Sequence, residues 1–511
     1  MDNTQRPLRQ VSYNEQGIRV ALQLFAILAT VATAILGSYI IGSTTYGLYV
    51  VVAVLGAITS LVVINKPSLG VYILVVFIYL DFSSVIEITF GIPSINKVLV
   101  ALVAVSILGT KVTIRRENLV FGVSGTLIIF HSLIMIATIL VSELSPNLDL
   151  VVDIVKDLAI LFIILQVSSE ERSFKTIQWL MLASAAFLAL LTTYQLLSGN
   201  YEFEFWGLAQ APIHQIIDNY DDVRPTGPLD DPNFYAQILL MVLPVGIYRV
   251  LGTQNSLRRL IALFACAVIA FAVIGTYSRS AFVTFVVVAA LIAIEQRVQL
   301  YKIATIVIVG VLIGLPLLPR GFMERVATLT EFAGAFTNGA NSVTEVSLRG
   351  RTSEILVAWE LFTDYPVFGV GYGNYPQYYQ EYAAGLGLDN RLEERDAHSL
   401  YFEYLAETGL IGFSAFIIML GVIFNLMMRA KKQMREIDRL DMVYWIAGAQ
   451  MGLVAYLVNT ITLHDDYIRY LRLSLAMAAG VIILSRHIYK EALAESKHKN
   501  KNEKPKVIQA T

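Results

Sequence analysis

Charged residues are scarce in this chain, and cysteine is almost absent. Only 15% of the 511 residues are Asp, Glu, Lys or Arg, while 56% are hydrophobic; soluble domains carry about 25% charged residues. Together with a mean hydropathy of +0.63, this composition excludes a soluble globular protein and indicates one that crosses a membrane many times. The lone Cys266 excludes an internal disulfide and a metal site built from cysteines. We expect Cys266 to be a small packing residue.

A cleavable leader is not evident either. About nineteen fairly polar residues precede the first apolar run, and no small-residue cleavage pattern follows that run. We therefore expect an uncleaved start. The charged tail 491–506 predicts disorder.

Apolar runs of the length that spans a bilayer, about twenty residues, recur along the whole chain. They predict an all-α polytopic membrane protein with about 14 transmembrane helices; the range is 12–14, because two runs are short or are interrupted by Asp81 and Glu87. The predicted spans are 18–41, 47–64, 69–90, 97–108, 119–141, 149–167, 174–197, 233–251, 259–277, 280–294, 301–318, 398–428, 443–463 and 470–485.

The distribution of Lys and Arg predicts the orientation. If the N-terminus is inside, most of the 38 lysines and arginines fall on inner segments, as the positive-inside rule requires. Both termini are then cytoplasmic. The predicted organisation is a cytoplasmic segment 1–17, spans 1–11 in 18–317, a large extracytoplasmic loop 318–397, spans 12–14 in 398–485, and a cytoplasmic basic tail 486–511. A loop of that length is more often functional than ornamental.

Several cations run against this charge pattern, because they lie on the outer side. Arg224 lies in a stretch rich in Pro and Gly before a span, and Arg279 lies in a very tight turn. Lys156 lies one to two turns inside a span, at a depth where charges usually face the bundle interior. Each has a simpler alternative: a solvated arginine at a capped helix start, a side chain that reaches the headgroups, or a lysine neutralised by Asp153 and Asp157.

A lipid diphosphate would explain several fixed cations at an outer membrane surface. Arginine matches phosphate oxygens with two parallel hydrogen bonds, and Arg349 and Arg351 on the long loop add to the set. If the diphosphate is a leaving group, the same cations stabilise its developing charge. His398, at the start of a span, would be kept neutral by the helix N-terminus and so accept a proton from an attacking hydroxyl. A capping or interfacial histidine is the alternative.

Three other motifs are weaker candidates. The glycine-rich Gly369-Val370-Gly371-Tyr372-Gly373 lacks a preceding strand and is expected to be a turn rather than a phosphate loop. The aspartates of 218–231 match no EF-hand spacing and are expected to be solvated loop charges, so no metal site is predicted. His464-Asp465-Asp466 is a further segment that reaches the same outer side.

Taken in order, these motifs resemble the O-antigen ligase and polymerase superfamily. The residues that carry the resemblance lie between Arg224 and Gly412: Arg224-Pro-Thr-Gly, Pro232-Asn233, Ser278-Arg279-Ser280, Arg351 with Trp359, Pro366 with the glycine-rich segment, His398-Ser399-Leu-Tyr, and Glu407-Thr-Gly-Leu-Ile-Gly. Ser399 departs from the asparagine that this family often shows after the histidine.

The resemblance implies a bacterial inner-membrane glycosyltransferase with a GT-C-like architecture, inverting, independent of metals and without a cofactor. Its donor would be a polyprenyl-diphosphate-linked glycan, and its acceptor a glycan or a lipid core outside the cytoplasmic membrane. By this resemblance Arg224 and Arg279 clamp the diphosphate, Arg349 or Arg351 assists from the loop, and His398 activates the acceptor. A polymerase of O-antigen or exopolysaccharide repeats and an O-antigen ligase rank nearly equal, the polymerase slightly first. A flippase and a chain-length regulator are candidate partners; nucleic acid is not.

Two other function classes stay open from the residues alone. Lys156 with its neighbouring aspartates suits a small-anion transporter, but transporter sites lie near the midplane on broken helices, whereas these candidates gather at one surface. A non-catalytic component of a polysaccharide export complex predicts that the removal of His398 changes nothing.

Overall fold

The structure, a computed structural model, describes residues 46–91, 94–114, 118–144, 147–217, 220–297, 346–388, 395–464 and 468–502. These residues are almost entirely helical. One short antiparallel hairpin, β1 (Ile213–Ile217) and β2 (Tyr220–Val223), lies between two helices. The helices are α2 (Tyr46–Asn65), α3 (Pro67–Tyr79), α4 (Phe82–Phe90), α5 (Ile95–Leu108), α6 (Gly122–Val141), α7 (Leu148–Ser168), α8 (Glu171–Ser198), α9 (Pro232–Gly252), α10 (Ser256–Gly275), α11 (Arg279–Glu295), α15 (Val346–Asp364), α16 (Tyr375–Gly385), α17 (Leu400–Glu436), α18 (Leu440–Asn459) and α19 (Ile468–Asn502).

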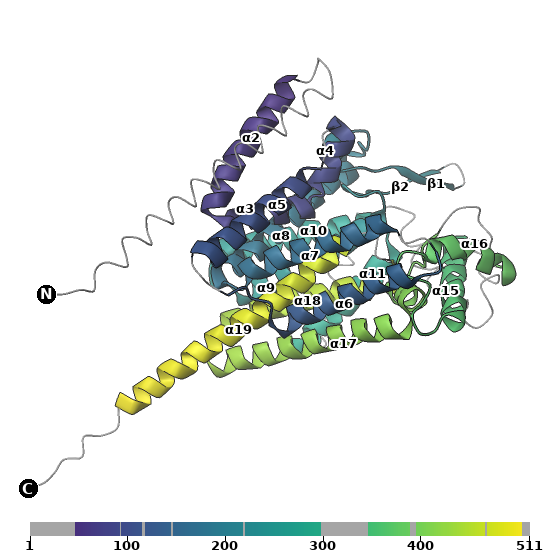
Figure 1. The fold of residues 1–511 in the computed structure, drawn as a ribbon. Coiled ribbons are helices and arrows are strands. Elements are labelled where there is room, and N and C mark those ends of the chain that lie inside the picture. Colours follow the sequence, from purple (N-terminus) through teal and green to yellow (C-terminus); the bar gives the residue numbers. More distant parts are fainter. Residues whose placement is uncertain are drawn as a thin grey trace, which may run out of the picture.

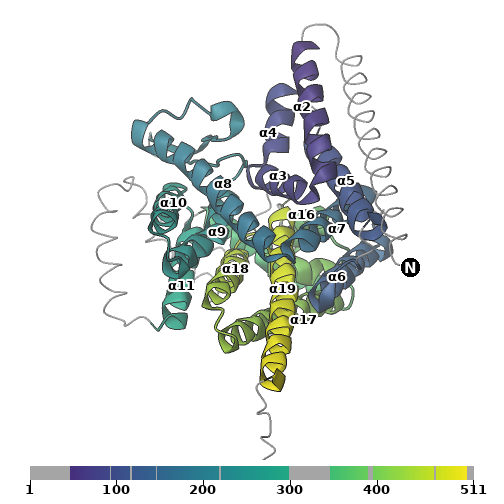
Figure 2. The ribbon, with the colours of Figure 1, turned by 90° about the vertical axis from the view of Figure 1, so that its left-hand side faces the viewer.

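The long helices form one bundle around a continuous apolar core (Figures 1 and 2). Helix α9 is buried along almost its whole length, which fits its apolar residues on every face. One end of the bundle carries α15, α16 and the β1–β2 hairpin, at the right of Figure 1. The far ends of α17 and α19 lie at the opposite side of the same view.

The polytopic, all-helical class is confirmed in its coarse form. Within the described residues, eight helices are long and apolar enough to cross a membrane, or nine if the bent pair α3–α4 is one span. Every predicted span that falls on described residues coincides with a helix. The short α11 and the charged α7 are not among those eight, and the predicted spans 18–41 and 301–318 lie outside the described residues. The count of 14 stays a prediction.

The predicted span 69–90 is bent rather than straight. Helices α3 and α4 meet at 63°, and Asp81 between them has a left-handed φ of 46°. The buried carboxylate of Asp81 pairs with Arg469 at 2.9 Å and accepts a hydrogen bond from Ser84. A buried charge needs such partners, so the acidic residue that interrupts the apolar run also ties α3–α4 to α19.

Helix α17 is broken near its start. Gly409 has φ 59° and ψ −166°, a conformation that only glycine adopts readily. The amides of Leu410 and Ile411 donate to the carbonyls of Pro366 and Val367, which satisfies donors that the break would otherwise leave unpaired. A side chain at Gly409 would meet the Val367 carbonyl. The predicted span 398–428 therefore consists of a short segment before Gly409 and a long segment after it.

The described part of the predicted loop 318–397 is folded rather than irregular. Helices α15 and α16 pack on each other around Val357, Leu361 and Tyr375, and this cluster reaches Ala406 of α17. Residues 318–345 lie outside the described residues. The loop therefore delivers the chain to His398 from a packed helical unit.

Candidate functional site

Arg224 is held at the start of α9. Asp231 caps this helix by accepting hydrogen bonds from the amides of Asn233 and Phe234, and Pro232 occupies its first position. The guanidinium of Arg224 donates to the Asn233 side chain at 3.3 Å and to the Thr276 carbonyl at 2.9 Å. It therefore joins the start of α9 to the turn after α10.

Arg279 lies at the other side of that turn. It is the first residue of α11, and Ser278 caps the helix by accepting from the amide of Ala281. Tyr277 has a left-handed φ of 55°, which makes the predicted tight turn possible. The Arg224 guanidinium donates to the Thr276 carbonyl, three residues before Arg279, so it lies against the turn that leads into Arg279.

His398 lies two residues before the start of α17 and pairs with Glu354, which no sequence motif had marked. Its Nδ1 lies 2.9 Å from Oε2 of Glu354 on α15. The Glu354 side chain is 1% exposed, and that of His398 is 27% exposed. The backbone of His398 has a left-handed φ of 44°. Such a conformation is rare for a residue with a side chain, and it is held here by the surrounding contacts.

Positively charged side chains lie near the buried carboxylate of Glu354. Arg395 lies 3.4 Å from Oε1, and Arg351 is one turn earlier on α15. Burial raises the pKa of Glu354, but the hydrogen bond and charge of His398 and the charges of Arg395 and Arg351 outweigh burial, so the pKa is lowered overall. The Glu354 carboxylate therefore lies at ion-pair distance from Nδ1 of His398. The Asp396 carbonyl, 3.4 Å from the same nitrogen, can only accept a hydrogen bond, so Nδ1 carries the hydrogen of the neutral ring and Nε2 is its basic nitrogen.

His464 completes the connection between His398 and α9. The rings of His398 and His464 meet edge to face with centroids 5.0 Å apart, and His464 meets Phe234 of α9 at 5.1 Å. Asp396 supports both histidines: its carbonyl lies 3.4 Å from His398 Nδ1, and its carboxylate lies 3.3 Å from His464 Nε2. Phe234 follows Asn233, the partner of Arg224, so these contacts place the histidine and Arg224 at one end of the bundle.

Of the two loop arginines, the structure describes the side chain of Arg351 but not that of Arg349. Arg351 is partly buried and within electrostatic reach of Glu354. Arg349 lies in the first turn of the same helix, but its side chain lies outside the described part. Arg351 is therefore the loop arginine within electrostatic reach of Glu354, the residue that pairs with His398.

Lys156 lies apart from this group. It forms an ion pair with Asp153 on its own helix, and its side chain is 40% exposed. That pairing is the internal neutralisation expected as the alternative. None of its described contacts connects Lys156 to Arg224 or His398, so its role in diphosphate binding stays a prediction.

The glycine-rich segment is a turn that surrounds a carboxylate. Gly369, Gly371 and Gly373 all have positive φ. The amides of Val370 and Gly371 donate to the backbone of α17, and the amide of Tyr375 donates to the buried Glu407 side chain at 3.0 Å. Backbone donors of this loop are thus used on the protein's own Glu407. The segment anchors the broken start of α17, as expected for a turn.

The acidic stretch before α9 has more than one role. Asp231 is the cap of α9, and Asp230 is exposed. Asp221 and Asp222 belong to β2, with side chains outside the described part, and Asp218 lies outside it entirely. Among the described residues, no group of three or more His, Cys, Asp or Glu is arranged to hold a metal ion.

One family model matches the predicted loop and the helices on either side of it. Residues 262–417 match the O-antigen ligase family. The resemblance to the O-antigen ligase and polymerase superfamily is confirmed. The matched segment runs from α10 to the membrane part of α17 and includes Arg279, Glu354 and His398, but it covers less than a third of the chain. A search of curated proteins finds no match.

The O-antigen ligase match supports the coarse functional prediction. It indicates a multi-pass membrane enzyme of the ligase or polymerase type, which uses a lipid-linked glycan donor and an acceptor in a membrane. Arg224, Lys156 and His464 lie outside the matched segment. Their roles rest on the contacts described above.

Proposed function

We propose that this protein transfers a polyprenyl-diphosphate-linked glycan onto an acceptor sugar hydroxyl at the outer face of the bacterial inner membrane. The observation that carries the proposal is the His398–Glu354 pair, a partly exposed imidazole whose Nδ1 lies 2.9 Å from a buried carboxylate. Such a pair fixes the tautomer of the ring and stabilises the imidazolium that forms when it accepts a proton.

The step is a single displacement at the anomeric carbon. The acceptor oxygen forms a bond to that carbon, its proton moves to Nε2 of His398, and the bond from carbon to the diphosphate oxygen breaks with inversion. The electron pair leaves with the diphosphate. Arg224 and Arg279, close together at the Thr276–Ser278 turn, would stabilise the additional negative charge. Arg351 would approach the same group from α15. No cofactor or metal takes part in this scheme.

The outer-face location rests on the distribution of Lys and Arg. With the termini in the cytoplasm, the end of the bundle that carries α15 and α16 faces outward (Figure 1). A donor lipid whose diphosphate lies at the headgroup level would then meet Arg224 and Arg279 without leaving the bilayer.

Reconstitution with defined substrates tests the proposal. Proteoliposomes that contain the full chain are given polyprenyl-diphosphate glycan, with or without a lipid-core acceptor. Glycan growth on the polyprenyl carrier alone indicates a polymerase, whereas product that requires the core indicates a ligase. A chelator arm tests metal independence: activity that chelation abolishes would contradict it.

Matched variants test the assigned residues. His398→Ala and Arg279→Ala should abolish product at equal expression and insertion. His487→Ala and Arg258→Ala should retain activity, because His487 is 71% exposed on the far part of α19 and Arg258 is exposed at the start of α10. Wild-type product from His398→Ala would refute the catalytic assignment.

A further inference from the structure

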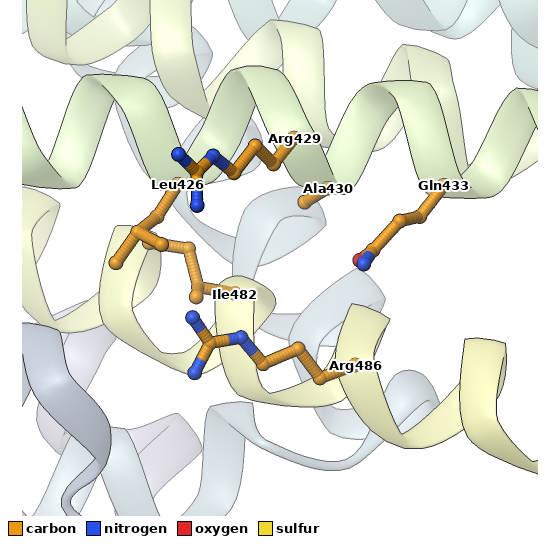
Figure 3. Close-up of a pocket in the computed structure, with 6 residues that line it drawn as sticks. All are labelled: Leu426, Arg429, Ala430, Gln433, Ile482 and Arg486. Atoms are coloured by element: carbon orange, nitrogen blue, oxygen red, sulfur yellow. The ribbon is translucent and has the colours of Figure 1, made fainter.

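A second group of arginines lies at the opposite end of the bundle from His398. Arg429 of α17 and Arg486 of α19 line a cavity of about 110 Å³, together with Leu426, Ala430, Gln433 and Ile482 (Figure 3). Because His398 precedes the first residue of α17 and Arg429 lies in its last quarter, this cavity is distinct from the site described above. Its volume is well above the 10–15 Å³ or so that one water molecule needs.

The two arginines mark the end of the apolar segments of their helices. Arg429 is the first charged residue of α17 after Glu407, and Arg486 is the first of α19 after Arg472. In a membrane, such positions lie at the level of the lipid headgroups. The cavity is therefore bordered by apolar side chains on its bilayer side and by cations at the headgroup level.

The side chains of both arginines turn back toward the bilayer side of the cavity. Figure 3 shows that Arg429 reaches back toward Leu426 on one helix and Arg486 toward Ile482 on the other. Side chains on a helix lean toward its N-terminus, and both helices approach this end from their N-terminal sides. Both arginines are exposed, and these two like charges border one cavity.

Several carboxylates at this end of the bundle are paired with residues other than Arg429 and Arg486. Glu295 pairs with Lys431, and Glu171 and Asp441 pair with Lys175 and Arg439. Glu436 accepts a hydrogen bond from Tyr489. Within the described residues, no carboxylate lies at ion-pair distance from Arg429 or Arg486. The cavity therefore has two guanidinium groups and an amide donor, Gln433, without an anion from the described part of the protein.

We propose that this cavity binds the phosphate group of an anionic phospholipid. Guanidinium groups match phosphate oxygens with paired hydrogen bonds, and one phosphodiester between Arg429 and Arg486 would relieve their mutual repulsion. Leu426 and Ile482 would contact the start of the acyl chains. The lipid would join α17, which carries the His398 site at its other end, to α19. The positive-inside orientation makes this the cytoplasmic leaflet.

A lipid titration tests the site directly. Phosphatidylglycerol is titrated into the detergent-solubilised full chain, and bound lipid is quantified by native mass spectrometry. Each arginine near an anionic lipid contributes roughly a fivefold gain in affinity. R429Q and R486Q should therefore each weaken binding about fivefold, and the double variant more than either. Arg→Lys replacements, which keep the charge but lose the planar fork, should bind with intermediate affinity.

The control pair is R258Q/R259Q, two exposed arginines at the start of α10 that do not line this cavity. It should bind phosphatidylglycerol as the wild type does. Equal losses in the control and the test pair would overturn the proposal in favour of general surface attraction, and an unchanged affinity of R429Q/R486Q would overturn it outright. Inorganic phosphate is the second probe: saturable, arginine-dependent binding that displaces the lipid would identify a free phosphate site instead.

Discussion

A buried carboxylate beside an imidazole decides which ring nitrogen carries the proton. Glu354 lies 2.9 Å from Nδ1 of His398, and the charges of Arg395 and Arg351 act on its carboxylate. A neutral amide of the same shape would keep the packing but would not stabilise an imidazolium. Under the proposed function, Glu354 would therefore act electrostatically and as a positioning residue, through His398.

Glu354→Gln should lower kcat by about a hundredfold, the lower end of what a positioned general base contributes. KM should change little, because the proposed role of Glu354 is exerted through the His398 ring rather than on the substrates. Glu360→Gln is the control, since Glu360 is exposed on the same helix. Initial rates of glycan transfer in proteoliposomes check both variants. A rise in KM with unchanged kcat would contradict the positional role.

Glu354 should also make the stability of the α15–α16 unit sensitive to acid. Its pKa is lowered in the fold from the usual 4.5, so its ionised form stabilises the folded state above about pH 4.5. That contribution is lost as the pH falls through the lower pKa that the carboxyl has in the fold. The wild type should therefore be more stable than Glu354→Gln near neutral pH, and the difference should shrink on acidification. Thermal unfolding at a series of pH values measures it; a constant difference would refute the linkage.

At the scale of elements, the broken start of α17 positions His398. The short segment before the break begins at Leu400, two residues after His398. Gly409 lets the chain turn into the long segment, while the carbonyls of Pro366 and Val367 accept hydrogen bonds from the freed amides. The glycine-rich turn binds Glu407 in the same region. The orientation of His398 thus depends on a backbone conformation that few residues permit.

Gly409→Ala should destabilise the protein by about 1–3 kcal/mol, because a Cβ would strain the left-handed backbone and meet the Val367 carbonyl. Gly421→Ala on the same helix is the control. Nothing lies within 4 Å of the Cβ added there, and alanine is favoured over glycine in a helix by up to about 1 kcal/mol. Thermal unfolding in detergent compares the two. Equal stability of both variants would show that the break is not under this constraint.

The sequence predicts a helix where its own segment determines it, and not where packing against a distant segment does. Apolar length predicts the bundle helices but not α15 and α16, which lie in the predicted loop. The scarcity of outer cations points to Arg224 and Arg279, and the position at the start of a span points to His398. Glu354 was missed because its partner is distant in sequence and the contact arises only when α15 packs beside α17. The bend at Asp81 and the break at Gly409 were also missed, because apolar length does not report how a helix pairs with its neighbours.

At the scale of the whole molecule, α11 runs between the two ends of the bundle. Arg279 begins this helix at the end of the bundle that carries the candidate site, and Glu295 ends it at the opposite end. There, Glu295 pairs with Lys431 of α17 at 2.6 Å and accepts a hydrogen bond from Tyr248 of α9. One carboxylate therefore holds three helices together and sets the position of the helix that carries Arg279.

Glu295→Gln should destabilise the protein by about 3–5 kcal/mol, because it leaves the Lys431 ammonium, whose side chain is only 3% exposed, without a counter-charge. The double variant Glu295→Gln/Lys431→Met should recover most of that loss, since no buried charge then remains. Lys432→Met is the control: Lys432 is exposed next to Lys431, and its replacement should change stability by less than about 0.5 kcal/mol. Denaturant or thermal unfolding of the four proteins measures these differences. If the double variant is as unstable as Glu295→Gln, the cost lies in packing around α11 rather than in the unpaired charge.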